Sequence, residues 1–238
     1  GALTSVTFPG VSQLTSIGNS AFQDDTALTS IAIPSTVTSI GVYAFKSAGA
    51  LTSVTFPGVS QLTSIGNSAF QDDTALTSIA IPSTVTSIGV YAFKSAGALT
   101  SVTFPGVSQL TSIGSSAFRA TGLTSFAMPN TVTTLGEGAF AQAPNLATVS
   151  LSAALTSIPV DAFYLDGALT GSLTIPAGVS TIGNNSFWHT ALTSLTLNAN
   201  LRTIGNGAFE HAPITGPLVL PGGVLTVGSG ACSNAPLP

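Results

Sequence analysis

Charged side chains are scarce in this chain. Four Lys and Arg and eight Asp and Glu stand among 238 residues, or 5%, where a soluble domain usually has about 25%. The net charge of −4 comes from scattered acids and indicates no particular partner. With so few basic residues the chain lacks the attraction for phosphates on which nucleic-acid binding depends, so the composition argues strongly against that class of function.

Long apolar runs and cysteine pairs are also missing. Hydrophobic residues make up 44% of the chain, yet no run approaches the roughly 18 residues that a membrane span needs. The single cysteine, Cys232, cannot form an internal disulfide, and no metal-ligand spacing surrounds it. We expect it to be a small apolar filler at the end of the fold, with an intermolecular crosslink as the alternative.

Motifs of catalysis are missing too. The sequence has no GxSxG elbow, no HExxH helix and no phosphate-binding loop. Hydroxyl groups are abundant, but a nucleophilic serine needs a base held beside it, and the chain has only two histidines. We therefore expect a protein that is not an enzyme and needs no cofactor.

What the chain does contain is one unit repeated ten times between Leu3 and Pro236. The stretch from Leu28 to Ala50, LTSIAIPSTVTSIGVYAFKSAGA, shows its pattern. Repeats of about 22–25 residues are typical of leucine-rich solenoids, in which each unit contacts only its neighbours. The prediction is a single solenoid domain over residues 1–238, with units that begin at residues 3, 28, 51, 76, 99, 123, 146, 169, 192 and 214.

The order of residues within the unit predicts its local structure. An L-x-x-V-x-F or L-x-x-I-x-I segment alternates as a strand and is usually ended by proline, which has no amide to donate. A second apolar pair, a glycine and then Ala-Phe follow. We expect a parallel β-sheet on one face, short second strands and turns on the other, and little helix. Core positions are Leu3, Val6, Phe8, Ile17, Phe22 and their equivalents, which leaves no phenylalanine over for a cofactor pocket.

The full pattern, LTSIxIPxxVTSIGxxAF, resembles the BspA-like leucine-rich repeats of microbial surface proteins. The resemblance implies a non-enzymatic extracellular or cell-surface module for adhesion, for protein–protein interaction with host or neighbouring cells, or for building a surface structure. Unit seven departs from the pattern, with Ser152 and Pro159 in place of the usual Pro and Gly. Units eight and ten have an extra residue in the first strand, which predicts a β-bulge.

Part of the chain is an unchanged duplication. Residues 1–48 recur without a substitution as residues 49–96, and a third copy runs from Gly97 to Gly114. Within this part the units alternate between PGVSQL and PSTV connections, so the true period is two units.

The position after each column phenylalanine varies freely, which predicts that it is exposed. In the later units it holds Arg119, Tyr164 and Trp188. Tyr164 and Trp188 should be surface neighbours on adjacent units, and exposed aromatic and arginine side chains are favoured at recognition surfaces. We take these three residues as the candidate binding site.

Other polar residues give weaker candidates. His189 and His211, with Glu210 beside them, could ligate zinc, but no third firm ligand accompanies the pair, so we predict no metal site. Paired acids at Asp24-Asp25 and Asp72-Asp73 lack the calcium-loop pattern and are expected to be solvated turn acids. Asn184 begins the sole N-glycosylation sequon.

Threonine and serine form outward columns in both strands of the unit. A structural role as strand formers that pair between units is the favoured interpretation. O-glycosylation is the second interpretation, and glycan or ice binding is the alternative function, although leucine-rich sheets are expected to curve whereas ice-binding faces are flat.

Both chain ends look like junctions between units. Gly1-Ala2 precedes the first unit as the same dipeptide precedes internal units, and Ala235-Pro236-Leu237 matches an internal junction. Open solenoid ends expose core side chains and strand edges, so copies could stack head to tail into a filament.

Overall fold

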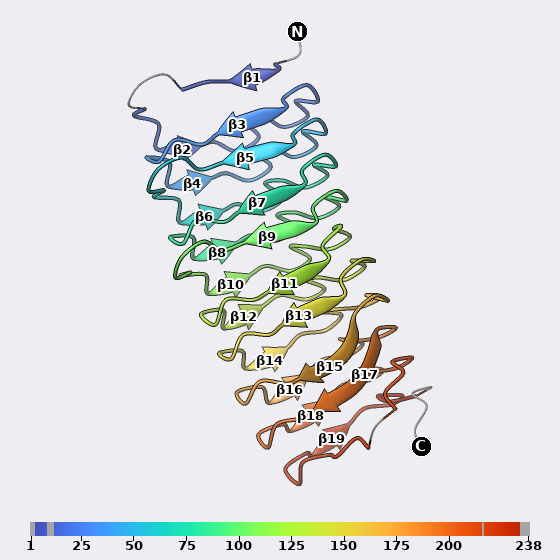
Figure 1. Ribbon diagram of the computed structural model, residues 1–238. Coiled ribbons are helices and arrows are strands. Elements are labelled where there is room, and N and C mark those ends of the chain that lie inside the picture. The colour runs from blue at the N-terminus through green and yellow to red at the C-terminus, as the bar shows by residue number, and fades with distance from the viewer. Residues whose placement is uncertain (1–2, 9–11, 216, 234–238) are drawn as a thin grey trace.

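The computed structural model describes residues 3–8, 12–215 and 217–233. These residues form a stack of about ten β rungs, one for each repeat unit, and contain no helix (Figure 1). It follows that no apolar helix long enough to cross a bilayer is found in them. The repeat solenoid predicted from the sequence is confirmed.

Each of the first nine rungs begins with a first strand. Exposed and buried side chains alternate along it, as in Ser30, Ile31 and Ala32. The first strands are β1 (Ser5–Val6), β3 (Ser30–Ala32), β5 (Ser53–Thr55), β7 (Ser78–Ala80), β9 (Ser101–Thr103), β11 (Ser125–Ala127), β13 (Thr148–Ser150), β15 (Thr170–Thr174) and β17 (Ala191–Thr196).

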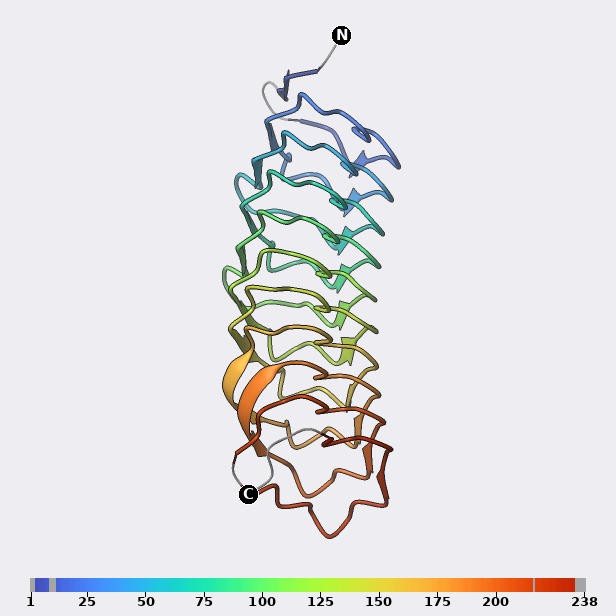
Figure 2. The ribbon, with the colours of Figure 1, turned by 90° about the vertical axis from the view of Figure 1, so that its right-hand side faces the viewer.

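A second strand of two residues follows in each rung, on the other side of the core (Figure 2). The second strands are β2 (Ser16–Ile17), β4 (Ser39–Ile40), β6 (Ser64–Ile65), β8 (Ser87–Ile88), β10 (Ser112–Ile113), β12 (Thr134–Leu135), β14 (Ser157–Ile158), β16 (Thr181–Ile182), β18 (Thr203–Ile204) and β19 (Thr226–Val227). The segment from the glycine to three residues past the column phenylalanine is called here the outer turn.

Strands pair in parallel with equivalent residues opposite each other, for example Val6 with Ile31. In the second-strand column the pairing stops between β12 and β14, in the unit that departs from the pattern. Other rungs donate a glycine amide to the rung before, as Gly183 does to the Ile158 carbonyl at 2.8 Å. Pro159 stands at that position in unit seven and has no amide to donate.

The predicted bulge of unit eight is confirmed, because the register of β15 against β17 shifts between Gly171 and Ser172. In unit ten the described residues contain only the second strand, β19, and Gly216 lies outside the described part. The residues that carry the end-to-end prediction, 1–2 and 235–237, also lie outside it.

A column of stacked phenylalanines forms the centre of the core. Successive rings lie 5.1–5.4 Å apart with interplanar angles of 11° or less. Eight of the rings are fully buried, whereas Phe22, at the first rung, is only partly buried. Leu3 in that rung is 43% exposed, because no described rung covers it.

The short and constant distance between neighbouring rungs explains the column of glycines at the start of the outer turns. A Cβ added to Gly89 would lie 2.6 Å from the Asn67 amide nitrogen, far inside contact distance. At Gly18, in the first rung, an added Cβ would meet nothing within 4 Å. The glycines of this column therefore permit a close approach to the preceding rung. The residues with positive φ lie two positions later, as Tyr91 does (φ 59°).

Phe118→Ala should lower the free energy of unfolding by about 3–5 kcal/mol, because it removes a fully buried ring from the middle of the stack. Chemical denaturation followed by far-ultraviolet circular dichroism measures the loss. Phe22→Ala, the same substitution at the partly buried end of the column, is the control and should cost clearly less. Equal losses of stability at both sites would contradict a core in which each ring is stabilised by the rings of its two neighbouring rungs.

Gly89→Ala should cost about 2–3 kcal/mol or more, because the methyl group overlaps backbone atoms that cannot move aside without separating two rungs. Gly18→Ala places the same methyl group in open space and should change stability by less than about 0.5 kcal/mol. Thermal denaturation of the two variants tests the difference. Matching melting temperatures would mean that rung spacing does not require glycine.

Candidate functional site

The candidate binding residues lie along one edge of the stack, on the outer turns of units five, seven and eight. Tyr164 and Trp188 stack with ring centroids 4.8 Å apart and an interplanar angle of 11°. The sequence predicted exposed side chains here, whereas both are half-buried, because each rung partly covers the next. Ala141, at the same position of unit six, is buried.

Arg119 lies at the other end of this strip. Its guanidinium donates two hydrogen bonds to the Gln142 Oε1 atom, at 3.1 and 3.0 Å. Because the intervening position is the small Ala141, a pocket of about 220 Å³ opens between Arg119 and Tyr164, with Glu137 and Asp161 also in its wall. The structure thus brings the three predicted binding residues into one strip, which we call the outer-turn strip.

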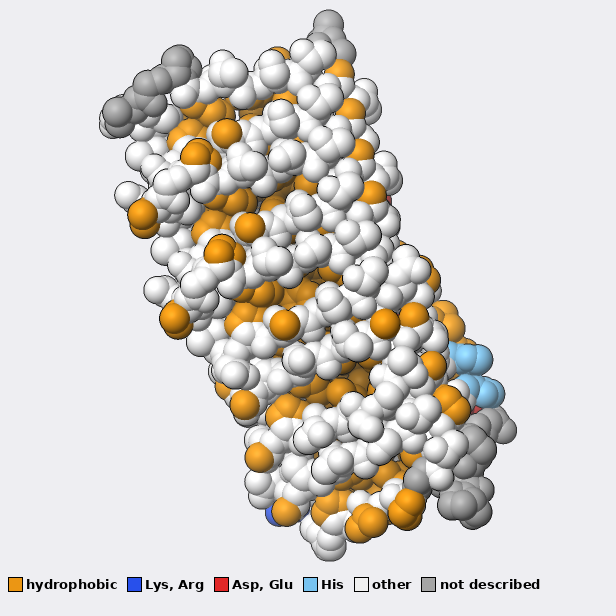
Figure 3. Space-filling model, viewed as in Figure 1, with side chains coloured by type: hydrophobic (Ala, Val, Ile, Leu, Met, Phe, Trp, Pro, Cys, Tyr) orange, Lys and Arg blue, Asp and Glu red, His pale blue; other side chains and the backbone are white. Residues whose placement is uncertain are grey.

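The two histidines, pale blue in Figure 3, extend the strip by one more position. Their rings stack at 4.4 Å, and Trp188 packs edge-on against His189 at 4.3 Å. Glu210 Oε1 lies 3.8 Å from His211 Nε2. Across the described ranges, no group of three His, Cys, Asp or Glu side chains is placed to hold a metal ion. The arrangement is an aromatic and imidazole surface.

Asp73 corrects the expectation of solvated turn acids. The side chain is fully buried, and its Oδ1 accepts a hydrogen bond of 2.8 Å from the Ala48 amide in the preceding rung. Its Oδ2 is buried without a partner. Burial raises the pKa of this carboxyl to about 9, while the Ala48 amide lowers it and the neighbouring Asp72 raises it further.

Asp166 repeats this arrangement with the Ala143 amide, again at 2.8 Å. Burial raises its pKa to about 8, against the lowering effect of that hydrogen bond. A signal for both residues was present in the sequence: they lie three residues past the column phenylalanine, where the other units, apart from Asp25 in unit one, have Ala, Thr121 or Thr190. Small residues at equivalent positions indicate an inward-facing column.

The first and last residues of the glycosylation sequon differ in their exposure. Asn184 is exposed, and its Oδ1 accepts a hydrogen bond from the Asn206 amide at 2.8 Å. The serine of the sequon, Ser186, is buried and donates its hydroxyl to the Gly183 carbonyl at 2.6 Å. Its hydroxyl is thus used inside the fold.

Threonine side chains of the outward columns donate hydrogen bonds to backbone carbonyls of the preceding rung. Thr38 Oγ1 donates to the Thr15 carbonyl and Thr63 Oγ1 to the Thr38 carbonyl, both at 3.0 Å, and the first-strand column repeats the pattern. Figure 2 shows the rungs stacked with little bend, in contrast to the expected curvature. The hydrogen bonds from these threonine hydroxyls to carbonyls of the preceding rung support a structural role for the columns.

Cys232 is partly buried and packs against the core, where it takes the place of the column phenylalanine. Burial raises the pKa of its thiol.

Four apolar pockets on the first-strand face were missed by the sequence reasoning, which placed every phenylalanine in the core. Phe8, Phe56 and Phe104 are only partly buried and each lines a pocket, as does Leu151 at the same position of unit seven. The volumes are about 450, 390, 530 and 330 Å³ from the first to the last (Figure 3). We call them the face pockets.

Comparison with known proteins gives the family. The profile described as a BspA type leucine rich repeat region, in six copies, matches residues 2–110 and 111–237. The chain therefore belongs to the BspA-type leucine-rich repeat family, as its sequence pattern suggested. No curated protein sequence matches it.

Solved structures of bacterial proteins share the fold. A leucine-rich repeat protein from Bacteroides ovatus has a TM-score of 0.68 at 26% identity, over 94% of this chain and 53% of that protein. The pneumococcal vaccine antigen PcpA has a TM-score of 0.66 at 26% identity, over 89% and 57%. A leucine rich cell surface protein from Faecalibacterium prausnitzii shares the fold at 22% identity, with a TM-score of 0.51 over 99% and 81%. The chain thus spans a little over half the length of the first two proteins.

The buried carboxyls should make stability depend on pH. Their folded-state pKa values of about 9 and 8 lie above the unfolded value of about 3.9, so the folded protein holds protons that the unfolded chain has lost. The contribution of these two carboxyls to the free energy of unfolding should be largest below pH 4. As pH rises from there towards 8–9, each carboxyl should lower the free energy of unfolding by up to about 1.4 kcal/mol per pH unit.

Denaturation midpoints between pH 5 and pH 9 measure this slope. Asp73→Asn with Asp166→Asn should flatten it, because the amide oxygen can still accept the hydrogen bond and no longer titrates. Asp25→Asn is the control: Asp25 has the same sequence context as Asp73 but is only half-buried in the first rung. A slope unchanged by the double substitution would show that the buried carboxyls do not cause it.

Proposed function

We propose that this protein is a non-enzymatic module of the cell surface that binds other proteins through the outer-turn strip, Arg119, Tyr164 and Trp188. The observation that carries the proposal is the Tyr164–Trp188 stack beside the pocket at Arg119. Trp, Tyr and Arg are the residue types most enriched among those that dominate protein–protein binding energies.

The chemistry of the strip supports a protein partner. Half-buried aromatic rings are already held by their neighbours, so they lose little conformational freedom on binding. All the charged side chains except Arg202 lie in outer turns, so this edge combines apolar area with charge of both signs. Such a surface suits a partner that has both apolar and charged groups.

The family and the descriptions of two structural relatives support a location at the cell surface. One structural relative is a vaccine antigen and another a cell surface protein. For this chain we infer a role in contact with proteins of host or neighbouring cells. End-to-end stacking into a filament stays a prediction, because the residues that carry it lie outside the described part.

Tyr164→Ala with Trp188→Ala should weaken binding to a protein ligand by about tenfold or more, since each residue is of a hot-spot type. The measurement is surface plasmon resonance of the 238-residue chain against a panel of extracellular-matrix proteins. Trp188 is the sole tryptophan, so its emission should also shift on addition of a ligand that covers it.

Tyr43→Ala with Tyr91→Ala is the matched control, because these tyrosines also lie in outer turns and are 42% and 40% exposed, but in earlier rungs. The control should bind as the unsubstituted chain does. If the Tyr164 and Trp188 variant keeps full affinity for every ligand of the panel while remaining folded, the outer-turn strip is not the binding site.

A further inference from the structure

The first-strand face carries projecting loops in units three and five. The PGVSQL connection of units three and five is longer than the PSTV connection of unit four and the PNTV connection of unit six, and it turns at Gly58 and Gly106 with φ of 76° and 78°. Val59 and Val107 at the tips are 88% and 89% exposed, which is unusual for so large an apolar side chain. We call these loops ribs; the equivalent loop of unit one, residues 9–11, lies outside the described residues.

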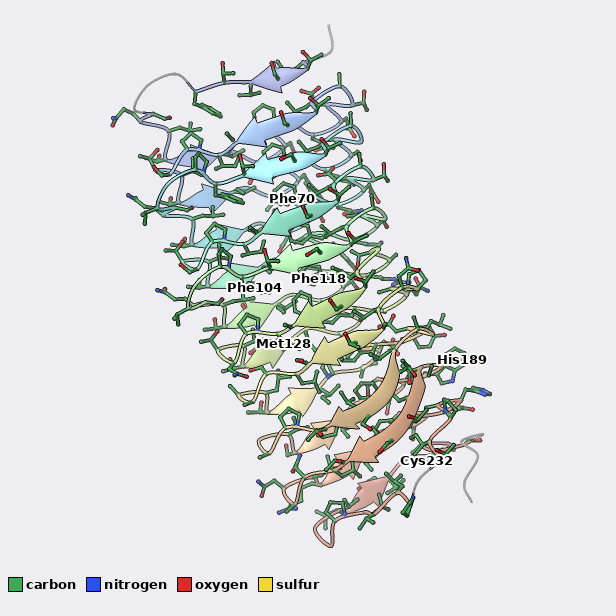
Figure 4. The ribbon with its side chains drawn as sticks, viewed as in Figure 1. Phe70, Phe104, Phe118, Met128, His189 and Cys232 are labelled. Atoms are coloured by element: carbon green, nitrogen blue, oxygen red, sulfur yellow. The ribbon has the colours of Figure 1, made fainter. Side chains whose placement is uncertain are left out.

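The face pockets lie between the ribs. The pockets lie at units one, three, five and seven. Each is lined by the end of the first strand of that unit, by the connection that follows it, and by the same segment of the next unit. The largest, of about 530 Å³, has Phe104, Met128 and Pro129 in its wall. Figure 3 shows these apolar hollows separated by ridges with apolar tips, and Figure 4 shows Phe104 and Met128 on this side of the stack.

Ribs and pockets share one spacing. Val59 and Val107 are equivalent residues two rungs apart, and so are Phe56 and Phe104, because the sequence repeats with that period. At about 4.8 Å per rung, projections and hollows both recur about every 9.6 Å along the axis. A corrugated surface of this kind fits a second surface with the same spacing.

No charged side chain lines the face pockets or forms the ribs among the described residues. Two such faces therefore meet without repulsion, and the few charges of both copies stay in water at the outer turns and at Arg202. A charged ligand would find no partner here and would have to lose its hydration.

We propose that the first-strand face is a self-complementary interface, on which a second copy of this chain packs antiparallel with its ribs in the face pockets. Two-fold symmetry makes the contact isologous, so Val59 and Val107 of each copy enter pockets of the other and the association stops at a dimer. Figures 1 and 2 show the rungs stacked with little bend, as a long contact between two such faces requires.

The available area is sufficient for a dimer of moderate affinity. The face pockets span about 35–40 Å along the axis, and a strand with its connection is about 15–20 Å wide, which gives about 500–800 Å² per copy. The total of about 1,000–1,600 Å² reaches the lower end of the range for specific interfaces. An extended peptide laid along the axis would have to cross every rib, whereas a second corrugated face fits between them.

Sedimentation equilibrium of the 238-residue chain under reducing conditions, from micromolar to millimolar concentration, tests the proposal. The chain should form dimers and no larger species. Val59→Asp with Val107→Asp should raise the dissociation constant by about a hundredfold or more, because four carboxylates per dimer would enter apolar pockets. Both positions are almost fully exposed in the single chain, so the fold should be unchanged by circular dichroism.

Tyr43→Asp with Tyr91→Asp is the matched control, since it adds the same charge at repeat-related positions of the outer turns and should leave the dimer intact. Small-angle scattering of the dimer should show a wider cross-section with the maximum dimension of the monomer. A dimer twice as long would mean end-to-end stacking and would overturn the proposal. So would a chain that stays monomeric throughout, which would leave the face to another ligand, or an aspartate variant that dimerises as tightly as the unsubstituted chain.

Discussion

The structure depends on hydrogen bonds from each rung to the next, because short rungs cannot satisfy their own backbone. The Phe45 amide donates to the Ala69 carbonyl and the Phe70 amide to the Ala92 carbonyl, at 2.8 and 2.7 Å. These bonds set a rung spacing at which a Cβ on a column glycine such as Gly89 would overlap the preceding rung, and at which the phenylalanine rings stack. Thr38 and Asn19 add side-chain bonds between rungs. The fold is therefore a chain of similar neighbour contacts, and each rung is as stable as the contacts on its two sides.

The fold could be predicted from the sequence because every rung repeats the same local rules. Alternation, proline and the Ala-Phe column fix the strands and the core without knowledge of any distant contact. The hydrogen bond that the buried Asp73 accepts could not be read in the same way, since its donor is the Ala48 amide of the preceding rung, which also donates to the Phe45 carbonyl within its own rung. The face pockets were missed for a related reason: the Pro-Gly connection leaves Phe56 and Phe104 partly uncovered, although their place in the strand pattern is that of core residues.

The surface is divided by chemistry. Charges and the aromatic stack lie on the outer turns, while the first-strand face is uncharged, ribbed and apolar in its hollows (Figure 3). Of the candidate site, the contact between Tyr164 and Trp188 could be predicted from their equivalent positions in adjacent units. The pocket at Arg119 could not, because it exists only where Ala141 leaves room between two larger side chains. A repeat thus predicts which residues are neighbours, and the irregular residues decide where a hollow forms.

The unchanged duplication has a consequence for evolution. The pairing of Ser30 with Ser53 is the same contact as that of Ser78 with Ser101, two rungs further on. Removal or insertion of one 48-residue block would therefore leave every remaining rung with a neighbour of the kind it already has. Recombination between identical gene segments could lengthen or shorten the stack by two rungs at a time without a new core to optimise. Stack length is then a trait that can vary rapidly in a population, while the sequence of each rung stays constant.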